Sequence, residues 1–275
     1  MAKLKCGIGF GINIMADQLV DIHALWIGKK LGALSSCCLR SFIMRGHNVY
    51  LHTYENIEDI PVGVKIVDAN NVIPKEKIFV HKKTGSYALF SDVFRYELLK
   101  KIDGVYVDCD VYCIKPLLKL DSDYTLGYQD DFEVNGAVLG LPKDSLLLEA
   151  LLNAAYDPFF IPPWYPTKKK RRLKIKKKFG LGKHVSNMPW GVIGPEAISY
   201  FVKKLELDNK VQPIDVFYPI HYQCIKQLLD PGLSIEDVTT SRTTCIHLFN
   251  EMLKKVDFHA LDENSLLSKM MRNEI

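Results

Sequence analysis

Short apolar runs alternate with longer amphipathic segments through the first half of the chain. The runs at residues 20–28, 48–54 and 62–69 have the length and composition of buried strands. The segment 31–46 between the first two has helical spacing and ends at Gly46, a common helix stop. Because strands and helices alternate at this spacing, we expect an α/β fold with a mainly parallel central sheet.

The clearest helical pattern covers residues 86–104, SYALFSDVFRYELLKKIDG. Apolar side chains three or four residues apart form a stripe predicted to face the core: Tyr87, Phe90, Phe94 and Leu98. Asp92 and Arg95 lie one turn apart on another face, where they form either a surface ion pair or part of a polar site.

Two aspartates follow the next apolar run, in the stretch VYVDCDVY at residues 105–112. Asp108 and Asp110 come at the carboxyl end of this predicted strand, where ligands bind in open α/β sheets. Carboxylates near a core need partners, and hard divalent cations take carboxylate oxygens. With Asp92 and Arg95 on the preceding helix, the pattern predicts a metal site beside a polyhydroxylated or phosphorylated ligand.

The second half of the chain is less regular. Strands are predicted at 124–129 and 134–142, and helices at 144–156 and 194–205. The intervening stretch DPFFIPPWYPT has four prolines and precedes a basic run. We expect three parts: an α/β core at 1–156, a Pro-rich and basic flap or excursion at 157–190, and the rest of the same domain at 191–275.

Composition limits the class of protein. A chain of 275 residues with 48% hydrophobic and 25% charged residues can bury a full core, which excludes general disorder. Seven cysteines, two of them adjacent, do not resemble a disulfide framework and favour a reducing, cytoplasmic compartment.

The amino terminus resembles a signal peptide, but its three glycines argue against one. Without an apolar stretch of about 18 residues, the chain is expected to be soluble or peripherally attached to the inner face of a membrane.

The basic charge is concentrated at residues 168–178, KKKRRLKIKKK, with nine Lys or Arg and no acid. The other 27 basic side chains are outnumbered by 32 acidic ones. The run can contact an anionic membrane or acceptor, or form a solvated loop. A nucleic-acid role is disfavoured, because no aromatic residues interleave with the basic ones.

Four segments resemble glycosyltransferase family 32, whose members carry a sugar-binding region with a DXD motif: IHALWIG (22–28), SDVFRYELL (91–99), GVYVDCD (104–110) and CIHLFNE (245–251). The family includes α-1,6-mannosyl-, α-1,4-galactosyl-, capsule and lipopolysaccharide enzymes, and is similar in this region to clostridial toxin glucosyltransferases. The resemblance implies a GT-A fold, a Rossmann-like single domain, and sugar transfer that retains the anomeric configuration. Retention implies either a covalent intermediate or front-face attack.

The resemblance also implies roles for individual residues. Trp26, in the loop after the first strand, matches the aromatic that stacks on the donor base, and Tyr106 matches a second nucleoside contact. Asp92 and Arg95 match the pair that holds the donor sugar, with Arg95 also near the reacting centre. The metal contacts match four residues: Asp108, on the sugar side, Asp110, the direct ligand, and, near the carboxyl terminus, His247 and Asn250. A core histidine remains the alternative for His247.

The remaining candidates surround the donor site. Asp130 and Asp131 lie where the fold approaches the acceptor or donor sugar, or they form a turn. Asn135 matches a family segment lining the sugar pocket. Trp190 stacks on an acceptor sugar or packs in the core. Lys183 and His184 are candidates for contacts with the β-phosphate of the donor.

The expected function is transfer of a hexose (galactose, glucose or N-acetylhexosamine) from a UDP-sugar to a saccharide or glycolipid, with Mn²⁺ or Mg²⁺. GDP-mannose is the alternative donor. Two other classes remain: a phosphohydrolase of the haloacid dehalogenase type, which also ends a strand in D-x-D, and a non-enzymatic polyanion-binding module. The glycines of GIGFG, residues 7–11, have the wrong spacing for a dinucleotide loop.

Overall fold

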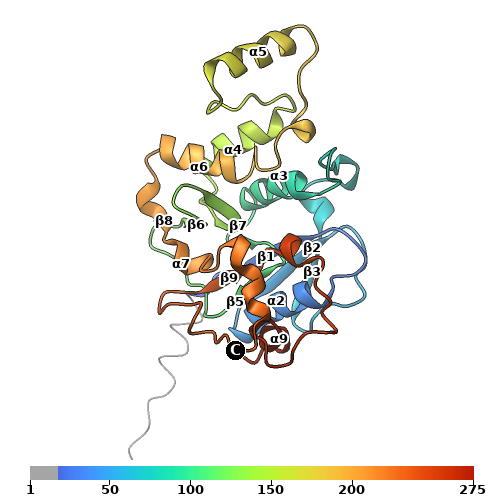
Figure 1. The fold of residues 1–275 in the computed structure, drawn as a ribbon. Coiled ribbons are helices and arrows are strands. Elements are labelled where there is room, and N and C mark those ends of the chain that lie inside the picture. Colours follow the sequence, from blue (N-terminus) through green and yellow to red (C-terminus); the bar gives the residue numbers. More distant parts are fainter. Residues whose placement is uncertain (1–17) are drawn as a thin grey trace, which may run out of the picture.

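The computed structural model describes residues 18–275, whose centre is a seven-stranded sheet in the order β3-β2-β1-β4-β7-β6-β8 (Figure 1). Its strands are β1 (Ile22–Trp26), β2 (Val49–Thr53), β3 (Val64–Asp68), β4 (Val105–Val107), β6 (Thr125–Tyr128), β7 (Val134–Gly140) and β8 (Val211–Gln212). Strands β1 to β4 pair in parallel, β7 runs antiparallel to both β4 and β6, and β8 is parallel to β6. The predicted α/β class with a mainly parallel sheet is confirmed.

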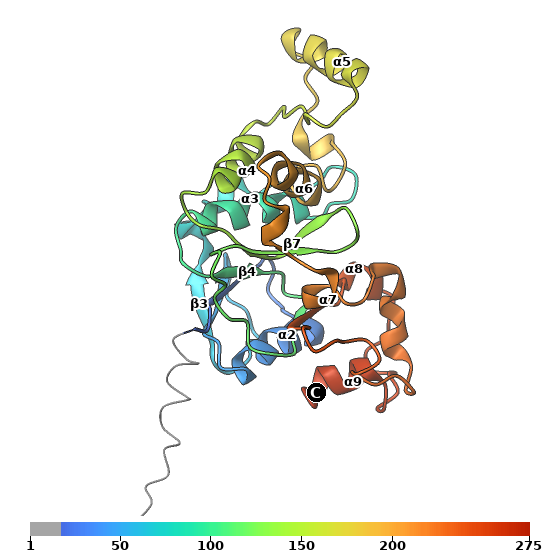
Figure 2. The ribbon, with the colours of Figure 1, turned by 90° about the vertical axis from the view of Figure 1, so that its left-hand side faces the viewer.

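Helices cover both faces of this sheet (Figures 1 and 2). On one face lie α3 (Ala88–Leu99), α4 (Leu146–Tyr156) and α6 (Pro195–Lys204), and their apolar side chains form one core with β4, β6 and β7. On the other face lies α2 (Ala33–Met44), which packs against β1 and β2 in a second core. The sheet is therefore buried on both sides, which explains the nearly continuous apolar runs of its first strands.

A two-stranded antiparallel ribbon brings the carboxyl-terminal part of the chain back to β4. It pairs β5 (Val111–Cys113) with β9 (Cys245–His247), with Val111 opposite His247. Three helices surround it: α7 (Ile214–Phe217), α8 (Asn250–Leu253) and α9 (Leu266–Arg272). Because β5 begins directly after Asp110, this ribbon connects the end of β4 to residues more than a hundred positions later.

Short 3₁₀ helices complete the connections: Ala69–Asn71, Lys75–Lys77, Val185–Asn187, Asp208–Lys210 and Tyr222–Leu229. The Pro-rich and basic excursion contains a regular helix, α5 (Thr167–Lys178), which the sequence pattern did not predict. Lys and Arg are good helix formers, and Pro166 and Gly180 lie just outside the helix, so its ends follow from the sequence.

The predicted helices and strands are otherwise found close to their expected positions, with two corrections. Tyr87 was expected in the core stripe of α3, but it precedes the helix and is exposed. Trp26 is the last residue of β1 rather than part of the following loop. The antiparallel direction of β7 was not predicted, because the apolar pattern of a strand does not reveal its direction. The predictions for the amino terminus and for residues 7–11 lie outside the described residues. Within the described part, no helix is long and apolar enough to span a bilayer.

Candidate active site

Asp108 lies where β4 ends, held by partners from three elements. Its backbone N–H donates to the carbonyl of Ala137 on β7, at 2.8 Å. The Tyr106 hydroxyl donates to Asp108 Oδ1 at 3.0 Å and also lies 2.9 Å from the Ser91 hydroxyl of α3. Tyr106 is fully buried, so its phenol fixes the orientation of the Asp108 carboxylate.

Arg95 is the centre of the polar network and is only 5% exposed. Its Nη2 lies 3.1 Å from Asp108 Oδ1 and 3.5 Å from Asp92 Oδ1, and its Nη1 donates to the Gly136 carbonyl at 2.5 Å. The guanidinium also lies over the Tyr106 ring, 4.6 Å from its centroid. Burial opposes the charge on Arg95, but the nearby Asp108 carboxylate raises its pKa above the ordinary value.

Asp92 is buried beside Arg95, which excludes the surface ion pair considered from the sequence. Burial raises the pKa of Asp92 to about 7, although Arg95 opposes the rise, and the Asp108 carboxylate adds to it. The backbone of Gly194 approaches this carboxylate closely: a Cβ on Gly194 would lie 2.5 Å from Asp92 Oδ2. Near neutral pH, Asp92 can therefore both donate and accept hydrogen bonds.

Asp110 and His247 form the second half of the site, on the β5–β9 ribbon. His247 Nε2 lies 3.2 Å from Asp110 Oδ1, and the backbone N–H of Asn250 donates to Asp110 Oδ2 at 2.8 Å. Burial alone would raise the pKa of Asp110, but His247 and the Asn250 N–H hold it below its ordinary value. The Phe249 ring lies against His247, with centroids 4.0 Å apart, and Phe249 adopts a left-handed backbone (φ +46°).

The residues present fit a divalent cation. One ligand atom from each of Asp108, Asp110 and His247 lies within 4.8 Å of the others. His247 Nδ1 is buried and has no hydrogen-bond partner among the described residues. Two carboxylates with one imidazole suit Mn²⁺, and Mg²⁺ less well, because Mg²⁺ prefers oxygen alone. Asn250, predicted as a ligand, enters the site through its backbone N–H.

Two further predicted residues lie around this network. Trp26 is half-buried at the end of β1, and its indole N–H donates to the Lys30 carbonyl at 3.0 Å. The Asn135 side chain on β7 accepts from the Ala137 N–H at 2.7 Å and donates to Gln129 at 2.5 Å. Asn135 thereby supports the backbone carbonyl that receives the Asp108 N–H.

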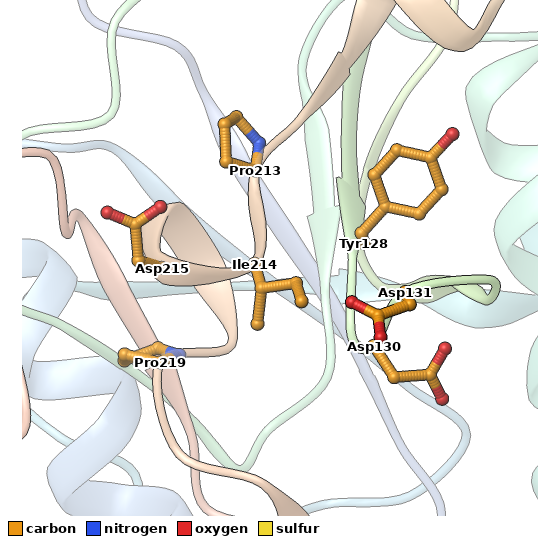
Figure 3. A pocket seen from close by; sticks show the side chains of 7 residues that line it. All are labelled: Tyr128, Asp130, Asp131, Pro213, Ile214, Asp215 and Pro219. Atoms are coloured by element: carbon orange, nitrogen blue, oxygen red, sulfur yellow. The ribbon is translucent and has the colours of Figure 1, made fainter.

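Asp130 and Asp131 lie in a separate pocket of about 460 Å³ (Figure 3). Figure 3 shows them beside Tyr128, facing a second segment of the chain, which contributes Pro213, Ile214, Asp215 and Pro219. Asp130 accepts from the backbone N–H groups of Phe132 and Glu133 at 2.9 and 2.8 Å, as the turn interpretation predicts. Among the described contacts, neither carboxylate joins the Asp108 network.

The three candidates from the excursion lie in a different environment. His184 accepts from the Ser186 N–H at 3.1 Å and packs against Phe159, so it caps a 3₁₀ helix. Lys183 is exposed on the same segment. Trp190 is 55% exposed on the loop that leads to Gly194. Within the described residues, none of the three makes a polar contact with Asp108 or Asp110.

Tyr218 is a site residue that the sequence did not reveal. Its hydroxyl accepts from the Val138 N–H at 3.0 Å, and its ring packs against His247, with centroids 5.9 Å apart. Tyr218 therefore joins β7 to β9 behind the two aspartates. No motif surrounds it, so only the tertiary structure identifies it.

Part of the chain is similar in sequence to known proteins. Residues 42–132 match the family model "Glycosyltransferase sugar-binding region containing DXD motif". Mouse (Mus musculus) lactosylceramide 4-alpha-galactosyltransferase is 26% identical over 179 residues, which cover 59% of this chain and 41% of that protein. This chain therefore spans less than half the length of that relative.

Two solved structures are also similar. PaToxG glycosyltransferase is 16% identical, with a TM-score of 0.43, over 73% of this chain and 76% of that one. The apo structure of the bifunctional glycosyltransferase WbbM is 11% identical, with a TM-score of 0.39, over 94% of this chain and 50% of that one. The predicted resemblance is confirmed: residues 42–132 match the DXD sugar-binding region, and the chain is similar in sequence to a glycosyltransferase.

Proposed function

We propose that this protein is a metal-dependent retaining glycosyltransferase that moves a hexose from a UDP-sugar to a saccharide or glycolipid. The observation that carries the proposal is the junction of two clusters at the end of β4. Asp92, Arg95 and Asp108 form one, and Asp110, two residues after Asp108, forms the other with His247. A sugar diphosphate needs both a polyhydroxyl-binding surface and a cation, and these two clusters offer them side by side.

Asp108, Asp110 and His247 are the residues that would hold the cation. A bound Mn²⁺ or Mg²⁺ would stabilise the charge that develops on the departing nucleoside diphosphate. Asp110 is held ready for this role, since the Asn250 N–H and His247 fix its two oxygens and keep it ionised. Tyr106 and Arg95 fix Asp108 in the same way from the other side.

Asp92 and Arg95 would bind the donor sugar. The rigid guanidinium is held by the Gly136 carbonyl and by Asp108, which leaves its position well defined. Asp92, with a pKa of about 7, offers a carboxyl group that can pair with sugar hydroxyls as donor or acceptor.

Trp26 would present its ring to the uracil base. We assign the buried Tyr106 to positioning Asp108 rather than to the nucleoside.

The pocket beside Tyr128 and Asp131 is our candidate for the acceptor. An aromatic face beside an exposed carboxylate is a common arrangement for binding a sugar ring, and both side chains line this pocket. Asp131→Asn should raise the KM for the acceptor and leave hydrolysis of the donor nearly unchanged. Loss of donor hydrolysis in this variant would instead assign Asp131 to the donor site.

The deciding experiment measures nucleotide release from a panel of UDP- and GDP-sugars, with Mn²⁺, with Mg²⁺ and with a chelator. We expect release from a UDP-hexose that depends on the cation and is lost in Asp110→Asn. Asp121→Asn, an exposed aspartate on a loop, is the matched control. Metal-independent turnover, or full activity of Asp110→Asn, would refute the proposal, and preference for GDP-mannose would select the alternative donor.

The same samples test the other classes. Phosphate release from a generic phosphomonoester would favour a phosphohydrolase. The long α/β segment before Asp108 and the pairing of Arg95 with that carboxylate support sugar transfer over this reaction. Binding of polyanions without turnover of any nucleotide sugar would favour a non-enzymatic module.

A further inference from the structure

The basic helix α5 lies at one end of the molecule, opposite the carboxyl terminus (Figures 1 and 2). None of its twelve residues is buried. The chain leaves the body after α4, forms this helix and returns through residues 179–194 to Gly194 beside Asp92. The helix is thus the outermost part of an excursion that ends at the candidate donor site.

One side of α5 contacts the rest of the excursion. Leu173 packs into a small apolar cluster, and Lys170 Nζ donates to the Pro163 carbonyl at 2.9 Å. Lys169 lies over the ring of Tyr165, with Nζ 3.2 Å from its centroid. Lys177 pairs with Asp157 at 2.7 Å. Lys170, Leu173 and Lys177 are three or four positions apart, and Lys169 is next to Lys170, so together they define the inner side of the helix.

The opposite side of α5 points away from the molecule and combines charge with apolar surface. Four cations on this side have no ion pair or hydrogen bond among the described residues: Lys168, Arg171, Arg172 and Lys178. Ile175 lies among them and is 50% exposed. Phe179 and Leu181, just past the helix end, are 72% and 71% exposed.

This combination fits an anionic bilayer better than a nucleic acid. Lysine and arginine near an anionic lipid surface each increase partitioning about fivefold. Aliphatic and aromatic side chains beside the cations are stabilised when they enter the membrane interface. The phosphate backbone of a nucleic acid has no apolar surface that could bury Ile175 or Leu181. Exposure of Ile175, Phe179 and Leu181 to water is unfavourable as well, so this apolar surface favours a partner that covers it.

We propose that the outer side of α5, with Phe179 and Leu181, docks on an anionic lipid bilayer. The cations contact the headgroups, and the three apolar side chains insert among them. Docking at this end would place the loop 179–194, and with it Trp190 and Gly194, between the bilayer and the candidate donor site. The inference stands on the surface of α5 alone and does not depend on the proposed reaction.

Co-sedimentation of the full chain with vesicles tests the proposal. Vesicles of phosphatidylcholine and phosphatidylglycerol in equal parts should bind the protein, and pure phosphatidylcholine should not. Charge reversal to Glu at the four outer positions, Lys168, Arg171, Arg172 and Lys178, should lower partitioning at least about a hundredfold, since each contributes about fivefold. The matched control reverses four exposed lysines on other elements: Lys100, Lys204, Lys226 and Lys255.

A second variant tests the apolar contribution without changing the charge. Phe179→Ser with Leu181→Ser should weaken binding at least about tenfold at high salt, where electrostatic attraction is screened. Circular dichroism checks that each variant remains folded. If the α5 variant and the control variant lost vesicle binding equally, binding would depend on net charge alone, and the proposal would be overturned. Tighter binding to an oligonucleotide than to the anionic vesicles would overturn it as well.

Discussion

A buried pair of histidines should make stability depend on pH in a way that one substitution can isolate. His23 on β1 and His52 on β2 lie side by side, with His23 Nδ1 3.0 Å from His52 Nε2. Burial lowers the pKa of each from 6.5 to about 4, and His23 lowers that of His52 further. Both rings are therefore neutral in the folded protein at neutral pH.

The sign and size of the effect follow from this difference. Between pH 6.5 and about 4 an unfolded histidine binds a proton that its folded counterpart does not, so stability falls as pH falls. Each ring contributes about 3 kcal/mol that is present above pH 6.5 and lost by about pH 4. Asp92 acts in the opposite direction, because its raised pKa lets the folded state bind a proton first.

The opposing effect of Asp92 means that the wild-type profile alone does not report on the histidines. The difference in stability between the wild type and His52→Phe cancels the contribution of Asp92, because both proteins contain this residue. At pH 8 the variant should be less stable by about 1 to 2 kcal/mol, because His23 loses its hydrogen-bond partner. At pH 4 the wild type has lost the stability that depends on neutral His52, whereas the variant has no histidine at this position. The free energy of unfolding of the variant should therefore equal or exceed that of the wild type.

Urea unfolding at intervals from pH 8 to pH 4 measures this crossing. His259→Gln, at an exposed position, is the control and should follow the wild type throughout. If His52→Phe and the wild type lose stability in parallel, His52 is not held neutral by burial and the reasoning fails.

Three further predictions concern the candidate active site. His247→Gln should weaken Mn²⁺ binding at least about tenfold, as measured by titration calorimetry, because an imidazole ligand is lost; unchanged affinity would exclude His247 from the metal site. Gly194→Ala should lower kcat/KM at least about tenfold, because its Cβ would lie 2.5 Å from Asp92 Oδ2, whereas in the control Gly191→Ala the nearest atom lies at 3.7 Å. Arg95→Lys should destabilise the fold by about 1 to 3 kcal/mol in urea unfolding, because lysine cannot replace the planar fork; unchanged stability would contradict the network.

The sequence predicted the half of the site that is encoded locally. Helical spacing placed Asp92 and Arg95 on one face, and the strand that follows carried Asp108 to the same edge of the sheet. Each step spans fewer than twenty residues and depends on backbone periodicity. The burial of Asp92 and Arg95 was not predictable, because it comes from Gly136 and Gly194 on later elements.

The other half depends on pairing between distant segments. His247 reaches Asp110 because β9 pairs with β5 in one register, with Val111 opposite His247. A shift of one residue would turn His247 to the other face of the ribbon, and no local pattern fixes that register. His247 was predicted only through the family resemblance of residues 245–251, and Tyr218, which lies in no such segment, was not predicted. The reversal of β7 also follows from tertiary packing, since a buried strand has the same apolar pattern in either direction.

The distribution of charge in the site explains why its carboxylates differ. Asp92 and Asp108 both contact Arg95, the permanent cation of their cluster, and Asp110 lies close to Asp108 in the neighbouring cluster. Arg95 lies closer to Asp108 than to Asp92, and Asp92 is the carboxyl whose pKa rises to about 7. Asp110 remains ionised on the far side through His247 and the Asn250 N–H. The excess negative charge therefore accumulates between Asp108 and Asp110, where a divalent cation would balance it.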